Sequence, residues 1–184
     1  KTKPMSFSEI ETERLILKPM DESFISEEYL SWMNDPEVYL YLETGGNYSM
    51  DELQEYVKQS VKKKTLFWAI TIKDNGKHIG NIKIDPISQR HGTGEYGILL
   101  GDRASWGKGY ASEATSGLLN YCFETLGIRK INLGVVKDNV SAVRLYEKLG
   151  FKTEGEFEAH GFYNGKYCNT LRMAVFNPAF THEK

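Results

Sequence analysis

The sequence predicts a mixed α/β domain with a mostly antiparallel sheet, and three observations lead to this class. Short apolar segments alternate with segments of helical periodicity along nearly the whole chain. Two Asn-Gly pairs, Asn75-Gly76 and Asn164-Gly165, lie between strand-like segments and predict hairpins. One strand–helix–strand unit, over residues 94–136, requires a parallel crossover. We therefore expect a twisted sheet of about seven strands flanked by about four helices.

Each element has a local reason in the sequence. Short apolar or alternating segments predict strands over residues 13–19, 67–72, 78–84, 94–100, 131–136, 151–162 and 167–176. Polar or glycine residues precede each segment of helical periodicity, at Asp21-Glu22-Ser23, Ser49, Gly107-Lys108-Gly109 and Asp138-Asn139. Ser49 and Glu52 have the spacing of a capping box. Gly127 and Gly150 stand where the last two helices end.

Composition limits the classes of function. A chain of 184 residues with 40% hydrophobic and 26% charged residues is expected to form one globular domain, here residues 5–180. The formal net charge of −2 argues against a nucleic-acid partner. No apolar run approaches the roughly 18 residues of a membrane span, and no signal peptide is recognisable, so we expect a cytoplasmic protein without a membrane partner.

The chain start and the two cysteines carry smaller expectations. Met5 is a candidate native start, with residues 1–4 a remnant of a tag or of processing. Cys122 and Cys168 are expected to be buried free thiols in a reducing compartment. The spacing of Cys and His residues matches no metal site, so we expect no metal.

The segment from Trp106 to Ala114 contains two glycines between a strand and a helix. Such a loop directs unpaired backbone N–H groups and the positive end of a helix dipole at an anion. Lys108 is followed by Gly109 rather than by the hydroxyl residue of a Walker loop, and Ser112 replaces the third glycine of a Rossmann loop. Taken alone, the segment fits either a pyrophosphate site or a tight turn before a helix.

The order of elements and three motifs resemble the GNAT family of acetyl-CoA-dependent N-acetyltransferases over roughly residues 11–176. Trp106-x-x-Gly109-x-Ala111 is similar to the family's pyrophosphate signature except at its first position, where Trp106 stands. The segment Asn139–Phe151 resembles the family's Asn-x-x-Ala-x-x-Leu-Tyr-Glu-Lys-x-Gly-Phe pattern. Residues 106–114, with Glu13–Leu17 and Trp32-x-Asn34-Asp35-Pro36, are similar to the RimJ/RimL-like branch. The resemblance implies a sheet that splays between its fourth and fifth strands.

The resemblance also assigns residues to acetyl-CoA as co-substrate. Pyrophosphate is expected on the N–H groups from Gly107 to Ala111, with Lys108 or Arg103 as a nearby charge. The pantetheine arm is expected beside the fourth strand and Asn139. The full set of expected contacts is Ile98, Leu99, Leu100, Trp106, Gly107, Lys108, Gly109, Tyr110, Ala111, Asn139, Ala142 and Tyr146.

The family's chemistry is attack of a free amine on the thioester carbonyl within a ternary complex. Tyr146 is the expected general acid for the departing thiolate, although its spacing alone also fits a core tyrosine. A backbone N–H near Leu99 or Leu100, where the family carries a bulge, is expected to polarise the carbonyl. Glu95 is either a base acting through water or a strand glutamate that orients the splay. Solvent is another route for the amine proton, and further titratable candidates are His78, Asp85, His91 and His160.

The acceptor is expected between the first two helices and the terminal hairpin. The candidate substrate residues are Trp32, Tyr41, Glu43 and Tyr163, with Tyr39 and Tyr167 nearby in the chain. Aromatic groups with a carboxylate suit a cationic amine, and the branch resemblance favours a protein N-terminal amine of the ribosomal-protein-alanine type. A nucleotide-linked amino sugar or other small amine is the alternative. An inactive coenzyme A-binding module is a third interpretation. The protein is expected to be a monomer or a homodimer.

Overall fold

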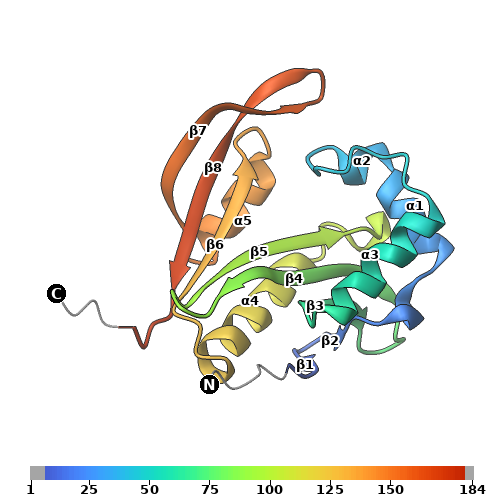
Figure 1. The fold of residues 1–184 in the computed structure, drawn as a ribbon, viewed down its shortest axis with the longest axis horizontal. Coiled ribbons are helices and arrows are strands. Elements are labelled where there is room, and N and C mark those ends of the chain that lie inside the picture. Colours follow the sequence, from blue (N-terminus) through green and yellow to red (C-terminus); the bar gives the residue numbers. More distant parts are fainter. Residues whose placement is uncertain (1–6, 181–184) are drawn as a thin grey trace.

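The computed structural model describes residues 7–180, which form one mixed sheet of eight strands in the order β1-β2-β3-β4-β5-β6-β8-β7 (Figure 1). The strands are β1 Ile10–Glu11, β2 Leu15–Pro19, β3 Leu66–Ile72, β4 His78–Ser88, β5 Thr93–Leu100, β6 Lys130–Val136, β7 Lys152–Tyr163 and β8 Lys166–Phe176. The α-helices are α1 Glu27–Asn34, α2 Pro36–Tyr39, α3 Met50–Lys62, α4 Tyr110–Asn120 and α5 Val140–Lys148. The mixed α/β class is confirmed, and the additions to the expected elements are the two-residue β1 and the single-turn α2.

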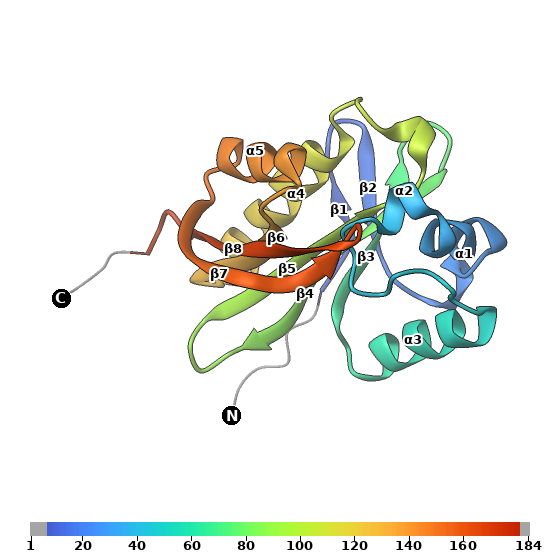
Figure 2. The same cartoon turned by 90° about the horizontal axis from the view of Figure 1, so that it is seen from above.

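Helices cover the sheet on both faces, as Figure 2 shows from above. Strand β3 reveals the division, because its side chains alternate between two buried clusters. Trp68 and Ile70 pack with α4 and α5 in the larger cluster. Phe67 and Ala69 pack with α1 and α3 in the smaller one. Since β3 is a central strand buried on both faces, its sequence is apolar almost throughout.

Strands β5 and β6 are the only parallel neighbours in the described sheet, and they pair over three residues. Thr93, Gly94 and Glu95 lie opposite Lys130, Ile131 and Asn132. Beyond Glu95, β5 continues to Leu100 paired only with β4 on its other side. The two strands therefore part in the middle of the sheet, which confirms the expected splay.

The structure corrects two local predictions. The first α-helix begins after Ser26, which accepts a hydrogen bond from Tyr29 N, whereas Asp21 caps a separate 3₁₀ turn. The bulge expected at Leu99 or Leu100 lies one to two residues later, because the N–H groups of Gly101 and Asp102 both donate to Ile79 O at 3.0 Å. The pairing of β5 with β4 is regular from Tyr96 to Leu100.

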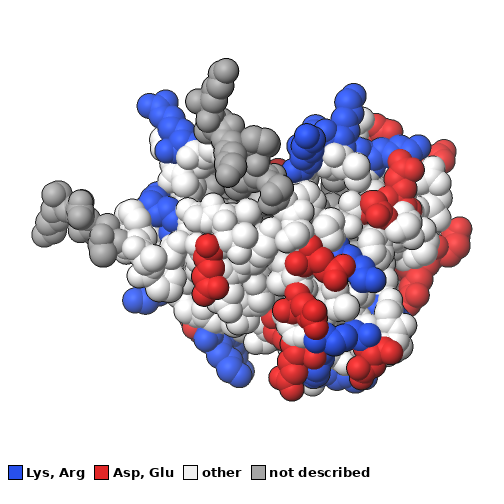
Figure 3. All heavy atoms as spheres, turned by 90° about the horizontal axis from the view of Figure 1, so that it is seen from below, with Lys and Arg blue, Asp and Glu red and all other residues white. Residues whose placement is uncertain are grey.

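Other sequence-based features agree with the structure. Ser49 and Glu52 form the capping box in both directions. Cys122 and Cys168 are buried free thiols. Acidic and basic side chains are mixed over the face in Figure 3, in keeping with the near-neutral net charge. Between residues 7 and 180 no helix is long and apolar enough to cross a membrane. The expectation for residues 1–4 falls outside the described part.

Helix α3 offers a matched test of the smaller cluster. Val57 is fully buried and Val61 is 46% exposed on the same helix. We expect Val57→Ala to lower the free energy of unfolding by about 2 kcal/mol, through lost apolar burial and the cavity left behind. Val61→Ala should change it by less than about 0.5 kcal/mol. Equal losses in urea unfolding would contradict this packing of α3.

Candidate active site

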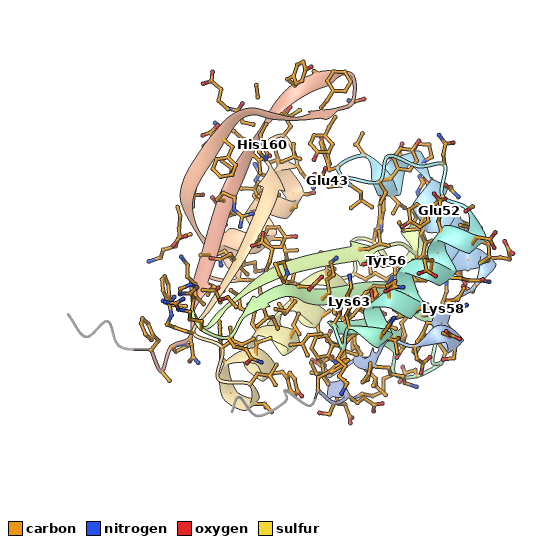
Figure 4. The ribbon with its side chains drawn as sticks, in the orientation of Figure 1. Glu43, Glu52, Tyr56, Lys58, Lys63 and His160 are labelled. Atoms are coloured by element: carbon orange, nitrogen blue, oxygen red, sulfur yellow. The ribbon has the colours of Figure 1, made fainter. Side chains whose placement is uncertain are left out.

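A cavity of about 950 Å³ lies where β5 and β6 part. Strands β4 and β5 line one side of it, and β6, the start of α5 and the β7–β8 hairpin line the other. The segment after α2 and the inner face of α3 complete the wall. Figure 4 labels three residues that line the cavity: Glu43 in the segment after α2, His160 on β7 and Tyr56 on α3.

Helix α4 begins near this region with an N-terminus that lacks a side-chain cap. Its N-cap, Gly109, has a φ of 80°, and no side chain caps the first turn. Gly107 has a φ of 72°, and a Cβ there would meet no other atom within 4 Å. The N–H groups of Tyr110, Ala111 and Ser112, the first three of the helix, lack intrahelical acceptors. This end of the helix has the geometry and polarity of an anion site.

Arg14 at the edge of β2 holds the glycine loop in place. Its Nη1 donates to Lys108 O at 2.9 Å, its Nε donates to Glu113 Oε2 at 2.7 Å, and its guanidinium lies 4.6 Å from the centre of the Tyr110 ring. Burial raises the pKa of Glu113, but hydrogen bonds from Thr12 and Arg14 outweigh it and leave that pKa below its usual value. The ionised carboxylate thus fixes the arginine, and the arginine fixes the loop.

Trp106 links the same loop to the end of β5. Its Nε1 donates to Leu100 O at 2.8 Å, and the Arg103 guanidinium lies 5.9 Å from its ring. The indole therefore has a positioning contact at the signature position where this sequence departs from the family pattern. Trp106 also lines the cavity, whereas the expected pyrophosphate residues Gly107 to Ala111 do not, so the glycine loop lies next to the cavity rather than in its wall.

Tyr146 of α5 faces the cavity from the apolar interior between the strands. It is 7% exposed, and its ring packs edge-on against Tyr96 and Phe151 at 5.6 and 5.7 Å between centroids. Tyr96 is anchored to α4, because its hydroxyl lies 2.7 Å from Thr115 Oγ1. Burial raises the pKa of Tyr146, and the neighbouring Tyr96 hydroxyl opposes part of this shift. The Tyr146 phenol therefore keeps its proton at neutral pH.

Glu95 forms a two-pronged ion pair across the splay. Arg172 on β8 donates from Nη1 to Oε1 at 2.7 Å and from Nη2 to Oε2 at 2.8 Å. The guanidinium reaches Glu95 by crossing β6 at Gly134, where a Cβ would lie only 2.9 Å from Nη1. The same carboxylate raises the pKa of Arg172. Both carboxylate oxygens of Glu95 are thus engaged by a cation.

The remaining coenzyme candidates lie around this centre. Asn139 caps α5, with Oδ1 accepting from Ala142 N at 3.4 Å, and it lines the cavity. Beyond Glu95, no strand of residues 7–180 pairs with the β6-facing edge of β5. Three cavity-lining residues of that edge are Ile98, Leu99 and Leu100. Ala142 is partly buried against the larger cluster rather than on the cavity wall.

Three of the four expected acceptor residues meet at the mouth of the cavity. The Tyr163 hydroxyl donates to Glu43 Oε1, and the rings of Tyr41 and Tyr163 lie 6.3 Å apart. Burial and the contact with Glu43 raise the pKa of Tyr163 to about 12. This contact joins the tip of the β7–β8 hairpin to the segment after α2, so it bridges the opening.

Trp32 is a wrong prediction for the acceptor wall. It is 5% exposed and packs in the smaller cluster, with its ring 4.9 Å from that of His78. A Cβ on Gly101 would lie 2.2 Å from the Trp32 ring, so the indole fills the space that this glycine leaves. Tyr39 and the 73% exposed Tyr167 also lie off the cavity wall.

The further titratable candidates for taking the amine proton lie in three different environments. His160 lines the cavity, whereas Asp85 and His91 are exposed away from it. His78 is enclosed by the rings of Phe24, Tyr29 and Trp32, and burial lowers its pKa.

Several cavity residues were missed in the sequence. Tyr96, Arg172, Asn81 and Lys83 all line the wall. No local pattern marked Asn81, Lys83 or Arg172, because each stands among other polar residues of β4 or β8.

Known proteins with similar sequence and structure point to one family. A family model described as an acetyltransferase (GNAT) domain matches residues 14–152. Uncharacterized N-acetyltransferase p20 of Bacillus licheniformis is 32% identical over 168 residues, covering 89% of this chain and 93% of its own. Spermidine N-acetyltransferase from Vibrio cholerae, solved in complex with CoA and spermine, superposes with a TM-score of 0.80 at 27% identity, covering 89% of this chain and 96% of its own. Ribosomal-protein-S5-alanine acetyltransferase from Vibrio fischeri (TM-score 0.77, 17% identity, 94% and 98% covered) shows the shared fold alone.

A double-mutant cycle tests the ion pair at the splay. We expect Glu95→Gln and Arg172→Met to couple by about 1 kcal/mol in the free energy of unfolding, a value held down by the 30% and 32% exposure of the two side chains. Lys137 and Glu156, 53% and 36% exposed with one contact, serve as the control pair and should couple less. Equal coupling energies in urea unfolding would refute a special role for Arg172.

Proposed function

This chain belongs to the GNAT family and is an N-acetyltransferase, and we propose that it transfers acetyl from acetyl-CoA directly to a small primary amine. One observation carries the proposal: the splay with Tyr146, the loop residue Trp106 and the Glu43–Tyr163 bridge all border a single cavity. Such a cavity allows donor and acceptor to be held together, so the acetyl group moves without an enzyme-bound intermediate.

The residues present fit coenzyme A. The uncapped N-terminus of α4, with open space at Gly107, suits the pyrophosphate. The unpaired edge of β5 offers main-chain groups to the amides of the pantetheine arm, as a partner strand would. Asn139 faces the same space from α5. When bound, acetyl-CoA supplies an acetyl group activated as a thioester.

Tyr146 is the proposed proton donor. Attack by the neutral amine nitrogen forms the new N–C bond and breaks the thioester C–S bond, so the sulfur needs a proton as it leaves. The raised pKa of Tyr146 keeps that proton in place at the pH where the amine is partly deprotonated. We assign the oxyanion contact to a backbone N–H at Leu99 or Leu100 on the open edge of β5.

Glu95 is proposed to orient the splay rather than to act as a base. Both of its oxygens accept from Arg172, and taking a proton from the amine would break this ion pair. In this scheme the amine loses its proton to water in the open cavity. The two roles predict different pH dependences for a Glu95 variant. Removal of a base lowers the rate of acetyl transfer most at low pH, where the amine is protonated.

The bridge between Glu43 and Tyr163 favours a small acceptor over the protein N-terminus expected from the branch resemblance. A peptide would have to pass beneath this contact or break it. A polyamine is the second candidate, since a relative in the comparison acts on spermidine by its name and Glu37 and Glu43 add negative charge to one wall. The inactive-module interpretation is disfavoured, because Tyr146, Asn139 and the open α4 terminus are all present.

The proposal extends to the domain bounds, the location and the oligomeric state of the protein. We propose one domain over residues 5–180, because the sheet continues from β1 to β8 without interruption. A cytoplasmic location agrees with two buried free thiols. The open edges of the sheet at β1 and β7 are compatible with a monomer or a homodimer.

An acceptor screen tests the proposed function. Thiol release from acetyl-CoA is measured with N-terminal peptides, polyamines, amino acids and amino sugars, both free and phosphate- or nucleotide-linked. We expect release of coenzyme A with at least one small amine and little with peptides. Preference for peptides would overturn the acceptor class, and coenzyme binding without turnover on any amine would favour the inactive module.

Tyr146→Phe tests the proton donor. We expect kcat to fall by about 10²-fold or more while the affinity for acetyl-CoA is unchanged. Because the pKa of Tyr146 is raised, the protonated form persists to higher pH, and the wild-type rate should not fall on the alkaline side until pH exceeds about 10. Tyr121→Phe, whose hydroxyl contacts Ser8, is the control and should retain the wild-type rate. A wild-type rate for Tyr146→Phe across the pH range would refute the assignment.

Gly109→Ala tests the phosphate end. Its φ of 80° is costly for alanine, by about 1–2 kcal/mol, and relief of that strain would move the N–H groups of α4. We expect the Kd for coenzyme A to rise about tenfold in calorimetric titration. Gly76→Ala places the same strain, at a φ of 71°, in the β3–β4 turn and should leave this Kd unchanged. If both variants raised the Kd for coenzyme A equally, the cause would be a general loss of stability and the assignment of the phosphate end would be contradicted.

A further inference from the structure

We propose that Asn81 and Lys83 bind an anionic group of the acceptor, so that the substrate is a primary amine that also carries a phosphate or carboxylate. This inference rests on the proposed acetyl transfer and narrows its substrate class. Both residues belong to β4 and line the cavity.

The register of β4 places the two side chains on one face beside the reaction centre. Asn81 lies opposite Leu99 and Lys83 opposite Gly97 in the pairing with β5. Because alternate residues share a face, the two side chains stand about 7 Å apart along the strand. An acceptor whose amine lies near Leu99 therefore extends over Gly97 toward Lys83.

Asn81 lies at the cavity wall with one buried donor that no described residue satisfies. The residue is 3% exposed, and its Nδ2 has no hydrogen-bond partner within the described residues. Its Oδ1 is already engaged, 2.8 Å from Nε2 of His78. Burial lowers the pKa of His78, and the Asn81 amide is held against its neutral ring. A buried amide N–H₂ without a partner costs free energy that a ligand oxygen would recover.

Lys83 supplies an uncompensated positive charge. Its Nζ lies 3.3 Å from the Tyr56 hydroxyl and 5.8 Å from the centre of that ring. None of the ion pairs found over residues 7–180 includes Lys83. Its stem lies beside Gly97, where a Cβ would be in ordinary van der Waals contact with Cε at 3.5 Å. The ammonium group is thus held at the wall of the cavity without a counter-charge.

The other charges of the cavity fit a dipolar acceptor. Arg172 and Glu95 neutralise each other. Glu37 and Glu43 lie on the wall formed by α2 and the segment after it, where they suit the amine in its charged form. Because Lys83 adds a positive charge to the cavity wall, a molecule with one amine and one anionic group matches the cavity better than a polycation such as spermidine.

Matched acceptor pairs test the anion site. Glucosamine 1-phosphate against glucosamine probes the phosphate, alanine against alaninamide probes the carboxylate, and spermidine is the polycation. We expect the wild type to favour the anionic member of at least one pair by about tenfold in kcat/KM. Lys83→Met should bring that ratio near one, Lys83→Arg should preserve it, and Lys83→Glu should invert it. Lys58→Met, an exposed lysine on α3 (Figure 4), should keep the wild-type ratio.

The outcomes separate this proposal from the proposed function. Preference confined to one pair identifies phosphate or carboxylate as the recognised group. Calorimetric titration of the same pairs in the presence of coenzyme A reads the charge preference even if no pair is acetylated. A wild-type preference for spermidine over every other acceptor would overturn the anion site. The same conclusion would follow if Lys83→Met left the preference for the anionic member of a pair unchanged in both kcat/KM and binding affinity.

Discussion

The parting of β5 and β6 after three paired residues is the constraint on which the site depends. Parallel strands that stayed paired would satisfy each other's main-chain groups and leave no opening. The Glu95–Arg172 ion pair lies at the last paired position, and Gly134 is the place where the guanidinium crosses β6. The opening is therefore fixed by a charged contact at its base. Strand β5 is held to β4 on its other edge, so it stays ordered while one edge is free.

Around this opening, different structural elements position the proposed coenzyme residues and the proposed acceptor residues. Arg14 and Glu113 fix the glycine loop at the start of α4 without lining the cavity. Tyr96 connects α4 to Tyr146 through Thr115, so the loop and the proposed proton donor are tied to the same helix. The acceptor side is built differently, from the tip of a hairpin and a segment rich in positive φ at Gly45, Gly46 and Asn47. The coenzyme side is thus braced by ion pairs and packing, and the acceptor side by a single contact.

The sequence predicted those parts of the site whose geometry is local. The glycine loop, the Asn139 cap and the position of Tyr146 on α5 all follow from spacing within one strand–helix or helix segment. Arg172 and Lys83 were missed because their importance depends on strand register across the sheet, which no local pattern states. Trp32 was misplaced because an aromatic residue on a short amphipathic helix fits a core or a cleft equally well until its neighbours His78 and Gly101 are known.

Direct transfer in a ternary complex is the central claim, and initial-velocity kinetics test it most directly. The rate is measured over a grid of acetyl-CoA and acceptor concentrations, with intact-protein mass measured after incubation with acetyl-CoA alone. One shared cavity predicts double-reciprocal lines that intersect and a protein mass without an added acetyl group. Parallel lines together with an acetylated protein would show a covalent enzyme intermediate and contradict the account.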